Sequence, residues 1–327
     1  MRVLLLGATG TIGLATARAL QSGGHEVVCL VRDKAGVKGS WTAEKTREQL
    51  AGMKVRFGDV QSAESVQKYG LLGEHFDAVV SCLASRTGTP RDAWAIDYQA
   101  HSQLLKLAQT VGIQQFVLLS AICVQKPLLG FQQAKLAFEK ELIESGLTYS
   151  IVRPTAFFKS LSGQIQRLKQ GQPFLLFADG RLTACKPISD HDLGHFIAAC
   201  LSDADKHKRV LPIGGPGEAI TPLQQGEYLF KLLGKTPKYK HVPVALLDVI
   251  INVLKILGKL IPPLADKAEL ARIGRYYATE SMLVWNTRTQ TYDANATPSF
   301  GTQTLFEHYE LLVAGKADVQ LGDHSVF

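Results

Sequence analysis

A lysine that follows an aromatic residue by four positions is the first pair in this sequence that could do chemistry. Phe131 and Lys135 stand in the stretch GFQQAK, residues 130–135. An ammonium group can hold the hydroxyls of a bound sugar and lower the local negative potential, so Lys135 is the candidate catalytic residue. A phenyl ring has no proton to give. Phe131 therefore indicates either a protein without catalytic activity or a reaction that needs no acid at this position.

A glycine-rich turn near the N-terminus could hold a pyrophosphate. RVLLL, residues 2–6, is a short apolar run of the kind that forms a strand buried on both faces. GATGTIG follows directly, and LATARAL continues as a helix. Glycines at positions 7, 10 and 13 permit a tight turn, a close approach of the backbone to phosphate, and close packing of helix on strand. Because a strand precedes these glycines and a helix follows them, the motif predicts a dinucleotide site.

The tip of the second expected strand selects between two dinucleotides. EVVCLV, residues 26–31, ends in Arg32, Asp33 and Lys34. An acidic side chain at this tip would accept a hydrogen bond from the ribose 2′-hydroxyl of NAD. Arg32 stands there instead, and a guanidinium matches a 2′-phosphate, while Asp33 is expected to be a solvated turn residue. The sequence therefore predicts NADPH as the cofactor.

Strands and helices alternate through the first half of the chain, which predicts an α/β fold with a doubly wound parallel sheet. The further expected strands and helices are residues 53–57, 76–82, 93–111 (helix), 115–120, 131–145 (helix) and 148–152. Ligands bind at the carboxyl ends of such strands. The loop 81–85, Ser120 and residues 153–155 all lie at such ends, so we expect them to face the cofactor.

The alternation weakens after about residue 155, which indicates a change of domain. We expect an NADP-binding domain over residues 1–155, to which residues around 187–215 return, and a mainly substrate-binding, smaller lobe over residues 156–327. Phe157 and Phe158 follow a sheet end. They are either core aromatics or one wall of a flat, apolar pocket.

The segment VPVALLDVIINVLKILGKLI, residues 242–261, is unusually apolar. The polar residues that interrupt it are Asp248, Asn252, Lys255 and Lys259. They make the segment too polar to cross a bilayer. It predicts either a helix that packs on the second lobe or a helix that lies on a membrane surface with its two lysines at the rim.

Charge and cysteine usage exclude several classes of protein. The formal net charge is +7, and no block of like charges accounts for it, which argues against a dedicated nucleic-acid arm. A diffuse positive field suits polyanionic small molecules or an anionic membrane surface. The five cysteines form no CxxC pair, so a disulfide scaffold, a zinc ribbon and an iron–sulfur site are disfavoured, and we expect a reducing compartment.

Two further features could be mistaken for functional signals. His191 and His195 lie one helical turn apart after a helix N-cap signature at Ser189 or Asp190, but no third ligand is evident, so we expect no metal site. The first 20 residues superficially mimic a signal peptide. Their glycines interrupt the apolar run, and a strand, turn and helix explain the same residues better.

Several motifs together resemble those of the atypical short-chain dehydrogenase/reductases, a group that includes isoflavone-reductase-like enzymes. These motifs are GATGTIG, LVRD, IVRPTAFF and FQQAK, in which Phe131 stands where a short-chain reductase has a tyrosine. The stretch GRYYATESMLVWNTRTQTYDANATPSFGTQTLFEHYE, residues 274–310, is more specific. It resembles the C-terminal part of the NADPH-dependent 3,8-divinyl chlorophyllide 8-vinyl reductases. The likeness covers essentially the whole chain.

This resemblance implies roles for individual residues. The pyrophosphate would contact Gly7, Thr9, Gly10, Thr11, Ile12 and Gly13, the 2′-phosphate Arg32, the adenine Asp59 and Val60, and the nicotinamide ribose Lys135. Phe131 would offer an apolar surface to the substrate. Independently of the resemblance, the strand-end positions of Leu83, Ala84, Ser120 and Pro154 make them further candidate cofactor contacts, and Phe157 and Phe158 are further candidate substrate contacts.

The resemblance also implies an oxidoreductase that reduces the 8-vinyl group of divinyl chlorophyllide or protochlorophyllide to ethyl, in chlorophyll or bacteriochlorophyll biosynthesis. The substrate would be a magnesium tetrapyrrole whose metal belongs to the macrocycle. The absence of a transit peptide suggests a bacterial, cytoplasmic form or a mature plastid chain in the stroma or at the thylakoid surface.

Two alternatives stay open at this point. The chain could be another atypical reductase or epimerase with a smaller substrate, or a non-catalytic NADPH-binding assembly or sensor protein. The sequence does not decide between protochlorophyllide and chlorophyllide, and it does not give the proton donor or the oligomeric state.

Overall fold

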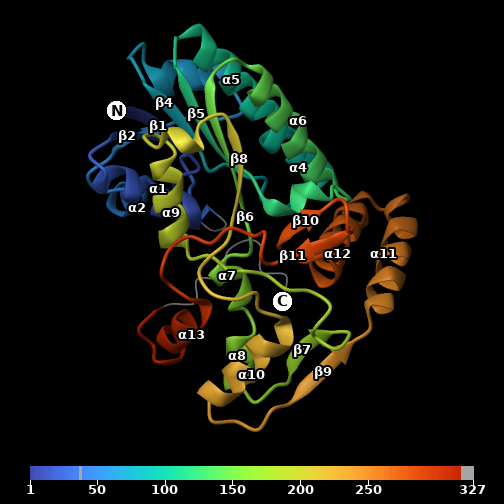
Figure 1. Ribbon diagram of the computed structural model, residues 1–327. Coiled ribbons are helices and arrows are strands. Elements are labelled where there is room, and N and C mark those ends of the chain that lie inside the picture. The colour runs from blue at the N-terminus through green and yellow to red at the C-terminus, as the bar shows by residue number, and fades with distance from the viewer. Residues whose placement is uncertain (37–38, 318–327) are drawn as a thin grey trace. The chain divides into compact units, whose positions relative to one another are not determined.

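The computed structural model describes residues 1–36 and 39–317, which form two compact units (Figure 1). Unit 1 contains residues 1–86, 90–154 and 190–212, and unit 2 contains residues 87–89, 155–189 and the described residues from 213 onward. The chain therefore leaves unit 1 after Pro154 and comes back to it at Asp190.

The elements of unit 1 alternate along the chain. They are β1 (Arg2–Leu6), α1 (Thr11–Ser22), β2 (Glu26–Val31), α2 (Ala43–Gln49), β3 (Lys54–Phe57), α3 (Ala63–Ser65), η2 (Val66–Leu71), β4 (Ala78–Ser81), α4 (Pro90–Ala93), η3 (Trp94–Ala100), α5 (His101–Thr110), β5 (Gln115–Leu119), η4 (Ile122–Gln125), α6 (Gly130–Glu144), β6 (Thr148–Pro154), α9 (Asp190–Ala199), η5 (Ala204–Lys206) and β8 (Arg209–Ile213).

In the described part of the chain, seven strands form one sheet in the order β3-β2-β1-β4-β5-β6-β8. The pairings from β3 to β6 are parallel, and Leu6 at the end of β1 lies opposite Leu30 of β2 and Ser81 of β4. The order reverses between β1 and β4, which is where ligands bind in open sheets of this kind. The prediction of a doubly wound α/β fold is confirmed.

Helices cover both faces of this sheet, with α1 and α9 on one face and α5 and α6 on the other (Figure 1). Gly194 of α9 lies so close to α1 that an added Cβ would stand 2.7 Å from the Ala15 carbonyl carbon. The core under α5 and α6 is continuous and apolar, with Phe116 and Phe138 almost fully buried in it. Because this core fixes both strands and helices, the strand ends form a rigid edge.

The expected helix over residues 93–111 is continuous but not uniform. It is formed by α4, η3 and α5, and η3 is a stretch of seven π-helical residues. π-helical turns often accompany functional sites because the extra residue redirects side chains. Asp97, a buried acidic residue, lies within η3.

Unit 2 combines helices with short strand pairs. Its elements are α7 (Phe158–Leu161), α8 (Ile165–Lys169), β7 (Phe174–Phe177), α10 (Pro222–Leu232), β9 (Tyr239–Val242), α11 (Val244–Gly258), α12 (Pro262–Thr279), β10 (Val284–Asn286), β11 (Thr291–Asp293) and α13 (Leu305–Val313). β7 pairs with β9 in parallel, and β10 pairs with β11 in antiparallel fashion. The core of the unit is an apolar cluster beneath α8, α10 and α13 that includes Phe158, Phe174 and Tyr309.

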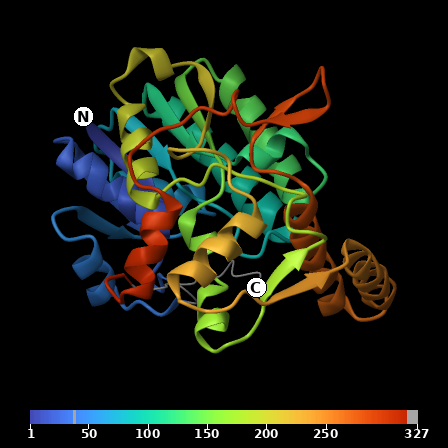
Figure 2. The ribbon, with the colours of Figure 1, turned by 60° about the horizontal axis from the view of Figure 1, so that its bottom comes forward.

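The apolar segment 242–261 contains the whole of α11, which lies along α12 (Figure 2). Within the described residues, the structure contains no helix that is long and apolar enough to cross a membrane. Gly258 lies so close to α12 that a Cβ there would come within 2.8 Å of the Ala265 amide nitrogen. One side of α11 therefore packs on the lobe, as one of the two sequence interpretations expected.

Candidate functional site

The glycine turn after β1 needs two of its three glycines for reasons of space. Gly7 has a φ of 77°, and a Cβ there would lie 2.5 Å from the Cys82 carbonyl oxygen in the loop after β4. A Cβ on Gly13 would lie 2.0 Å from the Gly7 carbonyl oxygen. Gly10 differs, because its nearest neighbour would be 3.5 Å away, an ordinary contact. The protein's own packing does not require a glycine at position 10, whereas a pyrophosphate close to the backbone would.

The first turn of α1 is arranged to receive an anion. Gly10 is its N-cap, no side chain caps the helix, and the first turn contains no acidic residue. The partial positive charge of the N-terminus is therefore not neutralised locally. Thr9 is half-buried and Thr11 is exposed beside this turn, while Ile12 is buried in the core.

The tip of β2 presents exposed basic groups. Arg32, Asp33 and Lys34 are all exposed. Within the described residues, the Arg32 guanidinium has no hydrogen-bond or ion-pair partner. Arg86, from the loop after β4, donates a hydrogen bond of 3.1 Å to the Gly36 carbonyl oxygen in the loop that follows Arg32. The region is therefore suited to a phosphate group.

The expected adenine contacts lie at the end of β3. Asp59 is exposed, and its carboxylate accepts a hydrogen bond of 2.9 Å from the Gln61 amide. Its own amide donates to the Ser65 hydroxyl over 2.9 Å. Val60 is 7% exposed and belongs to the core of unit 1. The loop is thus held in shape by its own hydrogen bonds.

The loop after β4 is tied to a buried carboxylate. The Ser85 amide donates to Asp97 Oδ1 over 3.3 Å, and the Leu83 amide donates to the Ser81 hydroxyl over 3.4 Å. Leu83 is half-buried and Ala84 is exposed. These bonds fix the backbone of the loop that the sequence assigns to the cofactor.

Lys135 lies on α6 and pairs with the same carboxylate. Its ammonium donates to Asp97 Oδ1 over 2.9 Å, and its side chain is only 11% exposed. Asp97 is fully buried, and its second oxygen, Oδ2, has no hydrogen-bond partner among the described residues. A buried pair of this kind holds both groups in place, because neither charge can be left alone away from water. Lys135 is thus a positioned cation and not a mobile surface residue.

The N-terminal turn of α6 is held by Gln132. This side chain is fully buried; its oxygen accepts hydrogen bonds from the amides of Leu128 and Leu129 at 2.8 and 2.9 Å, and its nitrogen donates to the Cys123 carbonyl at 3.1 Å. Phe131, the preceding residue, is 8% exposed. Because Gln132 locks the turn, Phe131 and Lys135 keep a fixed spacing.

Ser120, which follows β5, belongs to a second buried network. Its hydroxyl donates to Glu139 Oε1 over 2.5 Å, and Glu139 also pairs with Arg153 from β6. Glu139 is 2% exposed. The network fixes Ser120 at the sheet edge, next to the end of β6, where the buried Pro154 lies.

A buried histidine completes the polar groups near β4. His101 Nε2 lies 2.8 Å from the Ser81 hydroxyl, and Nδ1 lies 2.8 Å from the Ile96 carbonyl oxygen. Nδ1 therefore carries the proton and Nε2 accepts from Ser81. Burial lowers the pKa of His101 to about 4, and the nearby positive charge of Lys135 lowers it further. The ring is neutral at physiological pH and supports the strand end.

The two aromatics proposed for the substrate differ in environment within unit 2. Phe158 is 3% exposed and lies in the core cluster, where its ring contacts His308 at a centroid distance of 5.3 Å. This favours the interpretation of Phe158 as a core aromatic. Phe157 is half-buried, and its backbone forms a parallel bridge with Ile188. Its role at a pocket stays a prediction.

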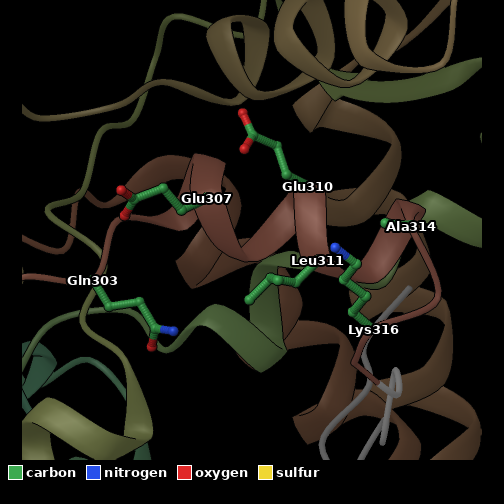
Figure 3. A pocket seen from close by; sticks show the side chains of 6 residues that line it. All are labelled: Gln303, Glu307, Glu310, Leu311, Ala314 and Lys316. Atoms are coloured by element: carbon green, nitrogen blue, oxygen red, sulfur yellow. The ribbon is translucent and has the colours of Figure 1, made fainter.

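Two hollows lie on unit 2. The larger, of about 480 Å³, is lined by residues of the 216–231 region and by Thr304, Leu305 and Phe306. The smaller, of about 360 Å³, lies along α13, and its labelled side chains do not converge on one point (Figure 3). Neither is lined by a residue that the sequence assigns to cofactor or substrate.

His191 and His195 are neighbours, as their spacing on α9 requires, with ring centroids 4.5 Å apart. Among the described residues, no group of three or more histidine, cysteine, aspartate or glutamate side chains is placed to hold a metal ion. All five cysteines are free thiols, and burial raises the pKa of Cys29, Cys82, Cys185 and Cys200 to about 12.

Sequence reasoning missed Asp97, Glu139 and Arg86. Asp97 is 38 positions from the lysine that it holds, and Glu139 is 19 positions from Ser120. No local motif surrounds either acidic residue. The available signal was only that both stand on predicted helices beside apolar residues, where an acid needs a partner.

Comparison with known proteins agrees with this geometry. Residues 7–204 match the model of a family described as NAD(P)H-binding. The chain is 51% identical to the divinyl chlorophyllide a 8-vinyl-reductase, chloroplastic, of Cucumis sativus, over 99% of this chain and 79% of that protein. It is also 28% identical to the photosystem II assembly factor Ycf39 of Cyanophora paradoxa, over 77% of this chain and 75% of that protein.

Solved structures share the fold at low identity. The NADPH-dependent quinone oxidoreductase QOR2 of Escherichia coli matches with a TM-score of 0.65 and 19% identity, over 95% of this chain and 99% of that chain. Leucoanthocyanidin reductase of Vitis vinifera matches with a TM-score of 0.65 and 17% identity, over 94% of this chain and 98% of that chain.

Proposed function

Because the chain belongs to the family of divinyl chlorophyllide a 8-vinyl-reductases, we propose that it reduces the 8-vinyl group of a divinyl chlorophyll precursor to an ethyl group. The observation that carries this function is the 51% identity that extends over 99% of the chain. The protein is therefore an NAD(P)H-binding oxidoreductase of chlorophyll biosynthesis.

NADPH supplies the hydride when it is bound. The glycine turn and the uncapped first turn of α1 fit its pyrophosphate. Arg32, which is exposed and has no partner among the described residues, fits its 2′-phosphate, which supports NADPH over NADH. The loop at Leu83 and Ala84, with Ser120 and Pro154, then forms the nicotinamide end of the same strand edge.

Lys135 is the proposed catalytic residue, and Asp97 is its positioning residue. The Lys135 ammonium has three N–H donors, and it donates only one hydrogen bond to Asp97. Further N–H donors are therefore available for the hydroxyls of the nicotinamide ribose. The same Asp97 oxygen also accepts from the Ser85 amide. One carboxylate therefore sets the position of both the lysine and the loop that would flank the ribose, and a shift in either would misplace the hydride donor.

The reaction explains why a phenylalanine can replace the tyrosine of other short-chain reductases. A carbonyl reductase produces an alkoxide and needs an acid beside the oxygen. Hydride addition to the terminal carbon of a vinyl group that is conjugated with a tetrapyrrole leaves the negative charge spread over the ring. A proton then adds to the neighbouring carbon and gives the ethyl group. Phe131 is proposed to offer an apolar contact to the flat macrocycle.

The substrate is proposed to be a magnesium tetrapyrrole, and the protein is proposed to work where such pigments are made. That is the bacterial cytoplasm or the plastid stroma, at the surface of a photosynthetic membrane. The family relative from Cucumis sativus carries the description chloroplastic. Chlorophyllide and protochlorophyllide present the same vinyl group, so both belong in the test.

The test measures the wavelength of the Soret absorption band of divinyl chlorophyllide, and separately of divinyl protochlorophyllide, during incubation with purified protein and NADPH. A blue shift that needs NADPH and becomes roughly 100-fold slower in Lys135→Ala is the expected result. The likeness to Ycf39 keeps a second function in view, a non-catalytic NADPH-binding assembly protein. Tight NADPH binding without any oxidation by either pigment would favour that second function and would contradict vinyl reduction.

A further inference from the structure

One face of α11 carries large aliphatic side chains that the fold does not bury. Leu246, Val249, Ile250, Val253, Ile256 and Leu257 follow the i, i+3, i+4, i+7 spacing of one side of α11, and Leu260 continues this spacing in the turn after Gly258. Every one of these side chains is exposed, up to 65% at Ile256 and 84% at Leu260. We call these seven residues the outer face of α11.

The opposite side of α11 is firmly packed, so the outer face is not exposed by a loose helix. Ile251 is buried, and Gly258 lies against α12. Asp248 forms an ion pair with Arg275 of α12. The hairpin of α11 and α12 therefore holds α11 in one orientation, and the aliphatic side chains point outward from a fixed support.

An exposed apolar face of this extent normally meets another apolar phase. At about 1.5 Å per residue, α11 is about 22 Å long, and its outer face follows that whole length. Isolated exposed aliphatic residues are common in proteins, but a continuous stripe on one helix is not.

The charges around the outer face indicate what covers it. Residues 244–279 contain five basic and three acidic side chains. Asp248 and Glu269 pair with arginines inside the hairpin. Among the described residues, Lys255, Lys259 and Lys267 have no ion-pair partner. At the helical spacing of α11, Lys259 lies about 60° around the helix axis from Ile256, beside one border of the outer face, and Lys255 lies about 40° further away on the same side of the helix.

From this arrangement we propose that the outer face of α11 docks on an anionic lipid bilayer, with the helix lying in the plane of the headgroups and its lysines contacting lipid phosphates. Aliphatic residues on one face and lysines on a flank of the same helix are features of helices that lie in a membrane interface. Pairing of two copies through this face would bring the lysines of both hairpins together, whereas anionic headgroups meet them with opposite charge.

This inference rests on the proposed location beside a photosynthetic membrane and adds the surface that makes the contact. It is independent of the chemistry of unit 1. Vinyl reduction measured with soluble pigment and no lipid tests the proposed function alone, so failure of one proposal is distinguishable from failure of the other.

The experiment is cosedimentation of the full chain with vesicles of phosphatidylcholine, with or without about one third phosphatidylglycerol. We expect binding to the anionic vesicles that weakens with salt and with Lys255→Gln/Lys259→Gln. The variant Val253→Ser/Ile256→Ser/Leu260→Ser should bind at least about 30-fold more weakly, because each aliphatic side chain loses its apolar contact. Leu182→Ser is the matched control, since Leu182 is an exposed leucine of unit 2 outside the hairpin.

Thermal unfolding and NADPH binding of each variant show that the fold is retained, as expected for exposed positions. Equal binding of wild type and the triple serine variant, or no binding of wild type to anionic vesicles, would overturn the proposal. So would a stable dimer in lipid-free buffer that the serine variant alone dissociates, because the outer face would then belong to a second copy of the chain.

Discussion

The two ends of the proposed cofactor site present their cations in opposite ways. At the tip of β2, Arg32 is exposed and has no partner among the described residues. At the other end, Lys135 is 11% exposed and is paired with the fully buried Asp97. An exposed guanidinium can adjust to a phosphate that arrives, whereas a buried ion pair is fixed before anything binds. We infer that the first end contributes affinity and cofactor choice, and the second end contributes geometry.

The largest effect is expected when the buried ion pair between Lys135 and Asp97 is broken. Lys135→Ala leaves Asp97 buried and unpaired, which should lower the free energy of unfolding by about 3–5 kcal/mol. Turnover should fall by roughly 100-fold, and the NADPH concentration needed should rise, because a positioned positive charge is lost. Denaturant unfolding and steady-state vinyl reduction measure the two effects.

Two further variants separate charge balance from catalysis. Lys135→Met/Asp97→Asn should regain most of the lost stability, since no charge is left unpaired, but should regain no turnover. Lys135→Arg should restore turnover only partly, because a guanidinium differs from an ammonium in shape. Full activity and stability in Lys135→Ala would show that the pair has no role in either.

The buried end should also respond to pH through His101. The pKa of this group is 6.5 in its ordinary state and about 4 in the folded protein. At a pH between these two pKa values, the unfolded chain binds a proton at His101 that the folded chain does not. The free energy of unfolding therefore falls as the pH drops from 6.5 to 4. The loss should reach at most roughly 3 kcal/mol.

Chemical denaturation at pH 7 and pH 4.5 measures that loss. His101→Gln should reduce the pH dependence, whatever its effect on stability at pH 7. His75→Gln is the control, because the His75 side chain is 74% exposed. An identical pH dependence in wild type and His101→Gln would show that the buried histidine does not contribute.

The exposed end should show selectivity without a loss of stability. Arg32→Ala should weaken NADPH binding by about 10- to 150-fold, the value of a charge-assisted contact of roughly 1.5–3 kcal/mol. NADH binding should change little, because NADH lacks the 2′-phosphate. Calorimetric titration with both cofactors gives the comparison, and Arg288→Ala, at an exposed position of unit 2, is the control. Equal losses for both cofactors would refute the role of Arg32.

The smallest effect is expected at Phe131. Phe131→Tyr adds a hydroxyl at a position that is 8% exposed, and a hydroxyl buried without a partner costs roughly 1–3 kcal/mol. Vinyl reduction at saturating NADPH should be unchanged or slower, while Phe131→Ala should weaken pigment binding more. A several-fold gain in turnover for Phe131→Tyr would mean that the native site lacks an acid that it could use.

Sequence reasoning succeeded where function is encoded by neighbours in the chain. The strand, glycine turn and helix over residues 2–22 are contiguous, and Arg32 directly follows its strand. Hydrophobic periodicity and local turn chemistry specify such units, so the fold class and the dinucleotide-binding turn could be predicted from residue order, whereas the NADPH preference deduced from Arg32 stays a prediction. The likeness of residues 274–310 to a known family added the reaction, which no periodicity could give.

Only the tertiary structure decided which distant residues meet. Parallel crossovers bring Asp97 to Lys135 and bring Arg153 to Glu139, and the π-helical stretch η3 contains Asp97. The sequence also left open which side of α11 is covered, because this helix carries aliphatic residues around most of its circumference. Its contacts with α12 settled that question. Pairing across a sheet and packing between helices depend on loop paths and register, which are properties of the assembled chain and not of any local stretch.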